Sequence, residues 1–219
     1  MKMHAMAVLI ALTALVSLAG CGGAVKYPNY YTLHVPPPPD PPVQEGVRVS
    51  LAVRDFRSPT YLHQGAIVYK TSPEQVGFYN YHRWAVDPRE FVTNAVADRL
   101  RASGNFTQVK LYDGRSDVDY VLSGRVEKLE EVDYEGGVKV EVALSAQMTS
   151  LTTGATVWTN AVSEVGTVGQ HDVQVVVSEM NRTMERAIEK LLTPPPASAA
   201  NKGNSTLYGT PTTPTSTSD

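Results

Sequence analysis

The sequence has only one cysteine, Cys21, among its 219 residues. A single cysteine excludes an intrachain disulfide, and in a secreted protein a lone cysteine points to some other use of its thiol. An excess of basic residues is also missing, since the net charge is −3 and the pI is about 6.0. Nucleic-acid-binding domains usually present a basic surface, so the composition argues against a nucleic-acid partner.

Recognisable catalytic and metal-binding motifs are missing as well. There is no GxSxG nucleophile motif, and neither Gly-Gly pair precedes a helix that could hold phosphate. The four histidines of the mature chain follow no zinc-ligand spacing, so we predict no metal site. These histidines are His34, His63, His82 and His171.

The sequence therefore predicts a protein that is not an enzyme and uses no cofactor. A group of carboxylates near a predicted hairpin end is the one feature that invites an acid–base interpretation. Because the group lies at a turn, we expect its charges to be solvated. The group comprises Glu127, Glu130, Glu131, Asp133 and Glu135. An anchored hydrolase is the enzymatic alternative, and no catalytic set supports it.

No apolar run reaches the roughly 20 residues that a transmembrane helix needs. Residues 5–18 form a shorter apolar run after Lys2, which is typical of a signal peptide over residues 1–20. The segment Leu18-Ala19-Gly20-Cys21 resembles a bacterial lipobox, in which the cysteine sulfur receives diacylglycerol. An ordinary signal peptide with an incidental cysteine is the alternative.

Lipidation of Cys21 predicts a firmly anchored protein of the cell envelope that faces the periplasm. Each buried methylene contributes about 0.8 kcal/mol, and more than one acyl chain is needed for stable anchoring. The residue after Cys21 is Gly22 rather than an aspartate, which favours the outer membrane over the inner membrane. The covalent lipid is the only non-protein group that the sequence implies.

Two segments of the mature chain have compositions that do not suit a packed core. Residues 36–42 read PPPPDPP and should form an extended polyproline stretch, so that residues 22–46 resemble one tether. Residues 194–219 are rich in Pro, Ser and Thr, and we predict that they are disordered.

The segment between them predicts one α+β domain with two layers, a mainly antiparallel β-sheet and two amphipathic helices on one face. The first helix should begin at Asp87, with Glu90 completing a capping box, and end at Gly104. The second should run from Asp172 to Leu192. Strands are expected over residues 47–54, 66–70, 78–86 and 106–112, followed by a three-stranded meander over 120–126, 138–148 and 155–165.

The segment from Tyr61 to Trp84 is unusually aromatic. Tyrosine and arginine are enriched in interface hot spots, so this segment is a candidate partner interface. The candidate residues are Tyr61, Tyr69, Tyr79, Tyr81 and Arg83. The alternative is that some of these side chains fill the core under the first helix, and Trp84 is expected to do so because it lies just before the helix cap.

With this segment the sequence resembles the ABC-type transport auxiliary lipoproteins, the group that includes paraquat-inducible protein C. The resemblance runs over nearly the whole mature domain and depends on the succession of several short motifs. They are Tyr30–Leu33, Val53–Phe56, Pro59–Leu62, Ile67–Tyr69, Tyr79–Trp84 before Asp87-Pro88, and Asp119–Gly124. The long Pro/Ser/Thr tail departs from the family.

The resemblance implies that Tyr30 to Leu33 is a first strand. The domain would then span residues 30–193, with 36–46 as an internal Pro-rich loop and 21–29 as the acylated cysteine and a short tether. It also implies a non-enzymatic accessory subunit that accompanies an ATPase, a permease and mammalian-cell-entry proteins in lipid transport between two membranes. Whether the chain forms a homo-oligomer is left open. A regulator of peptidoglycan synthesis, or of another envelope assembly machine, is the alternative function.

Overall fold

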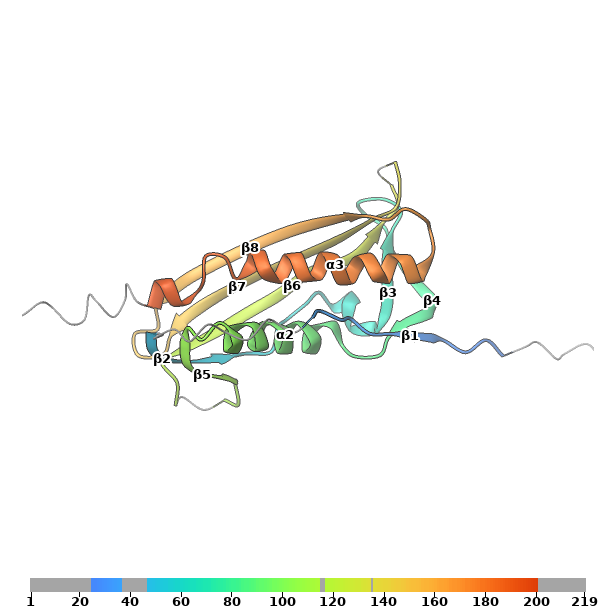
Figure 1. The fold of residues 1–219 in the computed structure, drawn as a ribbon. Helices are drawn as coiled ribbons and strands as arrows, with labels where there is room; N and C mark the ends of the chain where they lie inside the picture. The colour runs from blue at the N-terminus through green and yellow to red at the C-terminus, as the bar shows by residue number, and fades with distance from the viewer. Residues whose placement is uncertain (1–24, 37–46, 115–116, 135, 201–219) are drawn as a thin grey trace, which may run out of the picture.

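The computed structural model describes residues 25–36, 47–114, 117–134 and 136–200, with only the backbone of residues 47 and 48. The signal peptide, the lipobox with Cys21, nearly all of the Pro-rich loop and residues 201–219 lie outside the described residues, so the predictions for them stay predictions. Figure 1 shows one elongated domain, with two helices lying along a long sheet. Within the described ranges, no helix is both long enough and apolar enough to cross a membrane.

The observed helices and strands confirm the predicted α+β class and most of the predicted positions of these elements in the sequence. The strand implied by the family resemblance is present as β1, and it precedes the Pro-rich segment. The strands are β1 (Asn29–Tyr31), β2 (Val47–Val53), β3 (Ala66–Lys70), β4 (Val76–Trp84), β5 (Phe106–Leu111), β6 (Tyr120–Val132), β7 (Lys139–Ser150) and β8 (Thr156–Thr167). A 3-10 helix η1 (Thr60–Gln64) and the helices α2 (Pro88–Ala102) and α3 (Val173–Leu191) complete the fold.

Strand β6 is the centre of the sheet. One of its edges pairs with β7 over its whole length, and β7 pairs with β8, both antiparallel as the alternation predicts. Two strands share the other edge, because β2 pairs in parallel with the start of β6 and β3 pairs in parallel with its end. The sheet therefore forks, with β5 beyond β2 and with β4 and β1 beyond β3.

Phe56 fills the gap between the two branches of this fork. Its side chain is almost fully buried, and its ring lies directly over the backbone of Gly124 in β6. A Cβ atom at Gly124 would come within 2.3 Å of the ring, so glycine is needed there for the close approach. The next residue, Arg57, continues the parallel pairing by forming a bridge to Arg125.

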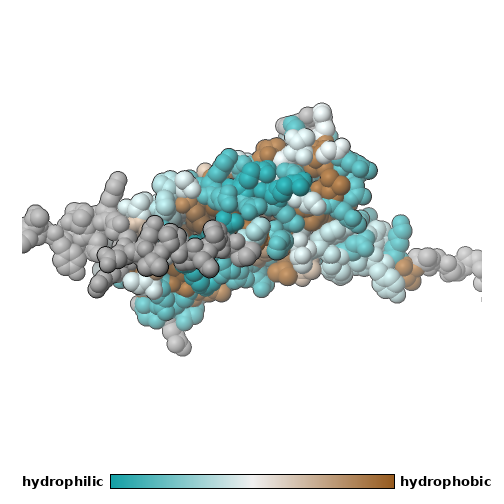
Figure 2. Space-filling model, viewed as in Figure 1, coloured by the Kyte–Doolittle hydropathy of each residue, from teal (hydrophilic) through white to brown (hydrophobic). Residues whose placement is uncertain are grey.

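Both helices lie on one face of the sheet, as predicted. The Asp87 carboxylate accepts hydrogen bonds from the Arg89 backbone N–H and from the Arg89 guanidinium, and so caps α2. The reciprocal bond of the expected capping box, from the Asp87 backbone N–H to the Glu90 carboxylate, is not formed among these described residues. Arg99 of α2 pairs with Glu185 and Glu189 of α3, which holds the helices side by side. Seen from the same side as Figure 1, the surface in Figure 2 is mostly hydrophilic, because the apolar stripes of the helices face the sheet.

The folded part of the chain extends beyond the predicted boundary at residue 194. Residues 197–200 form a helical turn, and Ala197 and Ala200 are buried in the main core. The Trp158 indole N–H donates a hydrogen bond to the carbonyl of Pro194 at 3.1 Å. The prediction of disorder is therefore wrong for residues 194–200. The small alanines fit against the core, although the composition of the segment offers no large apolar residue.

Asn160→Ala is expected to loosen this C-terminal segment. The Asn160 amide nitrogen lies 2.8 to 3.1 Å from the carbonyl oxygens of Lys190, Leu191 and Thr193, and so satisfies carbonyls at the end of α3. Its loss should lower the free energy of unfolding by about 1–2 kcal/mol and speed amide hydrogen exchange after α3. Thr159→Ala, on the neighbouring exposed position, is the control. Unchanged stability and exchange in Asn160→Ala would contradict this role.

Candidate functional site

The meander has one buried face and one polar face. In β7 the even-numbered residues are buried towards α3, and the odd-numbered ones point to the opposite face. Strand register places side chains in rows across that open face. Ser123 of β6, Gln147 of β7 and Thr159 of β8 form one row, and Arg125, Ser145 and Ala161 form the next.

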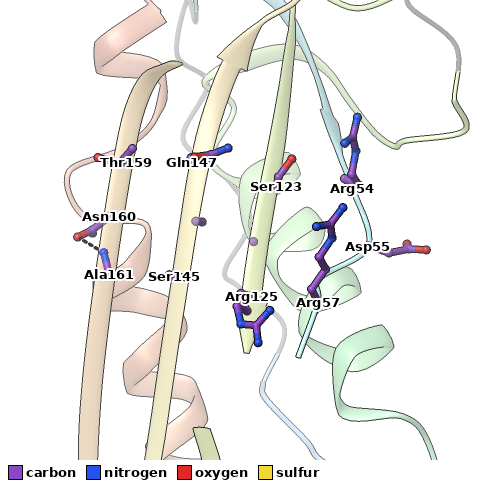
Figure 3. A pocket seen from close by; sticks show the side chains of 12 residues that line it. Arg54, Asp55, Arg57, Ser123, Arg125, Ser145, Gln147, Thr159, Asn160 and Ala161 are labelled. Atoms are coloured by element: carbon purple, nitrogen blue, oxygen red, sulfur yellow. Dashed lines mark hydrogen bonds between the residues drawn. The ribbon is translucent and has the colours of Figure 1, made fainter. Parts of the chain in front are cut away.

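A hollow of about 670 Å³ lies on this open face, and three arginines reach it (Figure 3). Arg125 comes from β6, whereas Arg54 and Arg57 come from the segment directly after β2. That segment is held against β6 by backbone hydrogen bonds from Arg54 N to the Leu122 carbonyl (2.8 Å) and from Arg57 N to the Gly124 carbonyl (3.0 Å). The three guanidinium groups are therefore positioned by backbone pairing.

The hollow carries unneutralised positive charge. Arg125 pairs with Glu127 at 2.8 Å, so its charge is balanced within β6. The Arg54 guanidinium stacks over the Tyr112 ring at 4.6 Å, and, within the described part of the chain, no carboxylate forms an ion pair with Arg54 or Arg57. Asp55 lies between these two arginines in sequence, but its side chain points away from them in Figure 3.

This arrangement suits an anionic group. The planar guanidinium fork matches the geometry of a carboxylate or a phosphate, and the surrounding hydroxyls and amide offer further hydrogen bonds. These arginines could not be recognised as a group from the sequence, because the segment after β2 and the strand β6 are far apart in the chain. No local pattern connects them, and only the parallel pairing on β6 brings them together.

The predicted aromatic interface divides into an inner and an outer part. The Tyr61 hydroxyl donates to the Glu130 carboxylate at 3.3 Å, and the Tyr79 hydroxyl donates to Glu131 at 2.9 Å. The Tyr69 ring packs edge-on against the Tyr79 ring, with centroids 5.1 Å apart. All three tyrosines are half-buried, and the hydroxyls of Tyr61 and Tyr79 form their hydrogen bonds within the domain.

The outer part of this segment reaches the surface beside β1. Tyr81 is 43% exposed and lies under the Lys26 ammonium group, while Arg83 donates a hydrogen bond to the Gln64 carbonyl. Tyr30 on the edge strand β1 is also exposed, next to Arg83 in register. Trp84 is buried, as expected. The docking role of the five candidate residues stays a prediction, with Tyr81 the most accessible of the tyrosines among them.

The prediction that the carboxylates near the hairpin are solvated is wrong for Glu130 and Glu131. Their side chains are 1% and 0% exposed, because β3 pairs with this end of β6 and brings tyrosines over it. Burial, together with the nearby Glu130 charge, raises the pKa of Tyr61 to about 12. Burial also raises the pKa of Tyr79, so both hydroxyls keep their protons and donate them.

Burial also disfavours the charged form of the Glu131 carboxyl. It raises the pKa of this carboxyl to about 7, against the opposing hydrogen bond from Tyr79 and with added repulsion from Asp133. Lys70, which lies 3.5 Å from the neighbouring Glu130, gives that second carboxylate a positive partner. The end of β6 therefore holds two buried acidic groups with different surroundings.

Comparison with known proteins gives one family and a set of similar folds. A family model described as the ABC-type transport auxiliary lipoprotein component matches residues 31–191. No curated protein matches the chain. Protein XCC0632 from Xanthomonas campestris is 14% identical with a TM-score of 0.68, and the match covers 80% of this chain and 99% of that one.

Two further solved structures are similar over most of the domain. An uncharacterised protein is 17% identical with a TM-score of 0.60, over 77% of this chain and 98% of its own. The PelC dodecamer from Paraburkholderia phytofirmans is 20% identical with a TM-score of 0.44, over 68% of this chain and 89% of its own. Identities this low show at most a shared fold. The TM-score of the PelC match is too low to support any inference about how this chain assembles.

Proposed function

Because the chain belongs to the family of ABC-type transport auxiliary lipoprotein components, we propose that it is the accessory subunit of a system that moves lipids between the two membranes of the envelope. The observation that carries this proposal is the family match over residues 31–191, which spans nearly the whole described domain. In this role the chain catalyses no reaction. It binds the mammalian-cell-entry protein, the permease or the ATPase, and ATP is hydrolysed by the ATPase subunit.

The lipobox supports a position at the membrane surface. An acylated Cys21 would hold the domain on the periplasmic side, and Gly22 after it favours the outer membrane. The described domain then faces the periplasm, where partner subunits that bridge the two membranes can reach it.

The open face of the sheet with its arginine hollow is the docking surface in this proposal, and its occupant is an acidic segment of a partner subunit. Charge complementarity supports this choice, because Arg54 and Arg57 present positive charge that no described carboxylate neutralises. A partner carboxylate could bind both guanidinium groups while the Ser123 and Gln147 side chains donate to the same segment.

Arg57→Glu is expected to weaken partner capture at least about tenfold, because a repelling charge replaces an attracting one at the centre of the interface. The measurement is affinity purification from crosslinked native membranes, with mass spectrometry of the captured proteins. The wild-type chain should recover a cell-entry protein, a permease or an ATPase. Arg101→Glu, a charge reversal on the exposed side of α2, is the matched control and should leave this recovery unchanged.

Three other results would change the proposal. Capture that survives Arg57→Glu but is lost in Tyr81→Ala would place docking on the aromatic segment predicted from the sequence. Equal capture by all variants would exclude both surfaces. Recovery of cell-wall synthases without any transport subunit would contradict the transport role and favour the regulator of peptidoglycan synthesis.

A further inference from the structure

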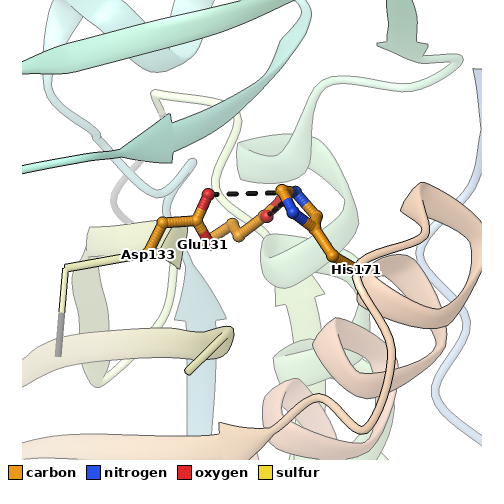
Figure 4. A group of neighbouring side chains, drawn as sticks. All are labelled: Glu131, Asp133 and His171. Carbon is orange, nitrogen blue, oxygen red and sulfur yellow. Dashed lines mark ion pairs between the residues drawn. The ribbon is translucent and has the colours of Figure 1, made fainter. Parts of the chain in front are cut away.

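A three-residue cluster lies at the opposite end of β6 from the β2 branch. Glu131 belongs to β6, Asp133 follows that strand, and His171 lies directly before the cap of α3 (Figure 4). One ligand atom from each residue lies within 4.8 Å of the other two. His171 Nε2 is 3.0 Å from Glu131 Oε1 and 3.8 Å from Asp133 Oδ2.

Two carboxylate oxygens of the cluster are buried and accept no hydrogen bond. The Glu131 side chain is fully buried, and its Oε1 accepts no hydrogen bond even though His171 Nε2 is close. Asp133 Oδ1 is also buried without a hydrogen-bond partner. Buried carboxylate oxygens in folded proteins are nearly always hydrogen-bonded or bound to a metal ion, so the unpartnered Glu131 Oε1, which faces His171, requires an explanation.

The Tyr79 hydroxyl also lies at the cluster, but it cannot donate to Glu131 Oε1 as well as to Glu131 Oε2. Tyr79 lies 2.9 Å from Glu131 Oε2 and 3.3 Å from His171 Nε2, and it has a single proton to donate. With that proton on Glu131 Oε2, Glu131 Oε1 and Asp133 Oδ2 lie 3.0 and 3.8 Å from His171 Nε2, as ion pairs if His171 is protonated and as a set of possible metal ligands if it is not.

We propose that Glu131, Asp133 and His171 bind a divalent transition-metal ion of the zinc class. Zinc takes carboxylate oxygen and imidazole nitrogen ligands at about 2.0–2.2 Å, which places tetrahedral donor atoms roughly 3.4 Å apart. The 3.0 and 3.8 Å separations at His171 lie on either side of that value. Mixed nitrogen and oxygen donors also favour zinc over magnesium or calcium, which prefer oxygen alone.

One residue beside the cluster orients a proposed ligand, and one side of the cluster is open to solvent. The Tyr79 hydroxyl holds the second oxygen of Glu131 and fixes the orientation of that ligand. The His171 side chain is 56% exposed, so an ion can enter from solvent and keep a position for water. A bound ion would tie the end of β6 to the start of α3. The proposal does not depend on the proposed transport function.

Zinc titration of the full mature chain in detergent, after metal removal with a chelator, tests the site. The probe is ZnCl₂ alone, with calorimetry for stoichiometry and thermal unfolding for stability. One ion should bind per chain, and the unfolding temperature should rise by about 5–10 °C at a free zinc concentration near 100 times Kd. His171→Ala and Asp133→Asn should each weaken binding by at least about 100-fold.

His63→Ala is the matched control, because His63 is exposed and lies outside the cluster. It should bind zinc as the wild type does. If His171→Ala and Asp133→Asn fold and still bind like the wild type, or if His63→Ala loses as much affinity, zinc is an adventitious ion only. Failure of the wild type to bind one ion, or stronger binding of MgCl₂ than of ZnCl₂, would also overturn the proposal.

Discussion

Phe56→Ala is expected to lower the free energy of unfolding by about 3–5 kcal/mol. The Phe56 ring is 2% exposed and fills the gap where the β2 and β3 branches separate along β6. Neither branch can close the resulting cavity, because each is held by its own backbone hydrogen bonds to β6. Urea unfolding followed by far-UV circular dichroism measures the loss.

A double-mutant cycle with Gly124 isolates the contact that causes this loss. Gly124→Ala alone should cost about 1–3 kcal/mol, because the new methyl group would overlap the Phe56 ring. In the Phe56→Ala background, the same methyl group enters an empty space and should cost much less. Additive costs, or a loss below about 1 kcal/mol in Phe56→Ala, would show that the ring does not support the fork.

Cys21→Ser is expected to abolish acylation completely. The sulfur of Cys21 is the only thiol in the chain, so a serine leaves no atom for the thioether bond to diacylglycerol. Metabolic labelling with a fatty acid and the intact mass of the purified chain measure the modification. Ser17→Ala, in the signal peptide but outside the lipobox, is the control and should keep the label.

Loss of the lipid should also release the domain from the membrane. Burial of two acyl chains contributes about 0.8 kcal/mol for each methylene, and a chain without the lipid lacks this contribution. A chain that begins at Gly22 and is exported with a conventional signal peptide should therefore fractionate with soluble periplasmic proteins. Retention of this form in washed membranes would mean that another part of the protein binds the membrane.

Local patterns in the sequence were sufficient for the meander and the helices. Alternation along β7 predicts its buried and polar faces, because each strand exposes one side to water. Asp87 and Asp172 mark the starts of α2 and α3, since a carboxylate can accept the free N–H groups of a first helical turn. The start of β1 came instead from the family resemblance, because three residues are too few to show a period.

The parallel pairings could not be predicted in the same way. Alternation reports which side of a strand is buried, but it does not report the direction or identity of the neighbouring strand. The fork at β6 therefore appeared only in the structure, and with it the burial of Glu130 and Glu131. Likewise, the contact of Ala197 and Ala200 with the core depends on the path of the chain after α3, and composition predicts only its low content of large apolar residues.

The sequence alone determined the helix caps and the alternation of the strands, because both depend on neighbouring residues. It also predicts the lipobox before Cys21, which lies outside the described residues and stays a prediction. Tertiary structure decided which distant groups meet. It brings Arg57 beside Arg125 to form a cationic hollow, and it places His171 against Glu131 and Asp133. These groups lie far apart in the chain, and the long strand β6 is the element against which their segments pack. Because β6 receives strands from both branches on one edge, its neighbours on that edge, β2 and β3, are set by tertiary packing and not by local sequence.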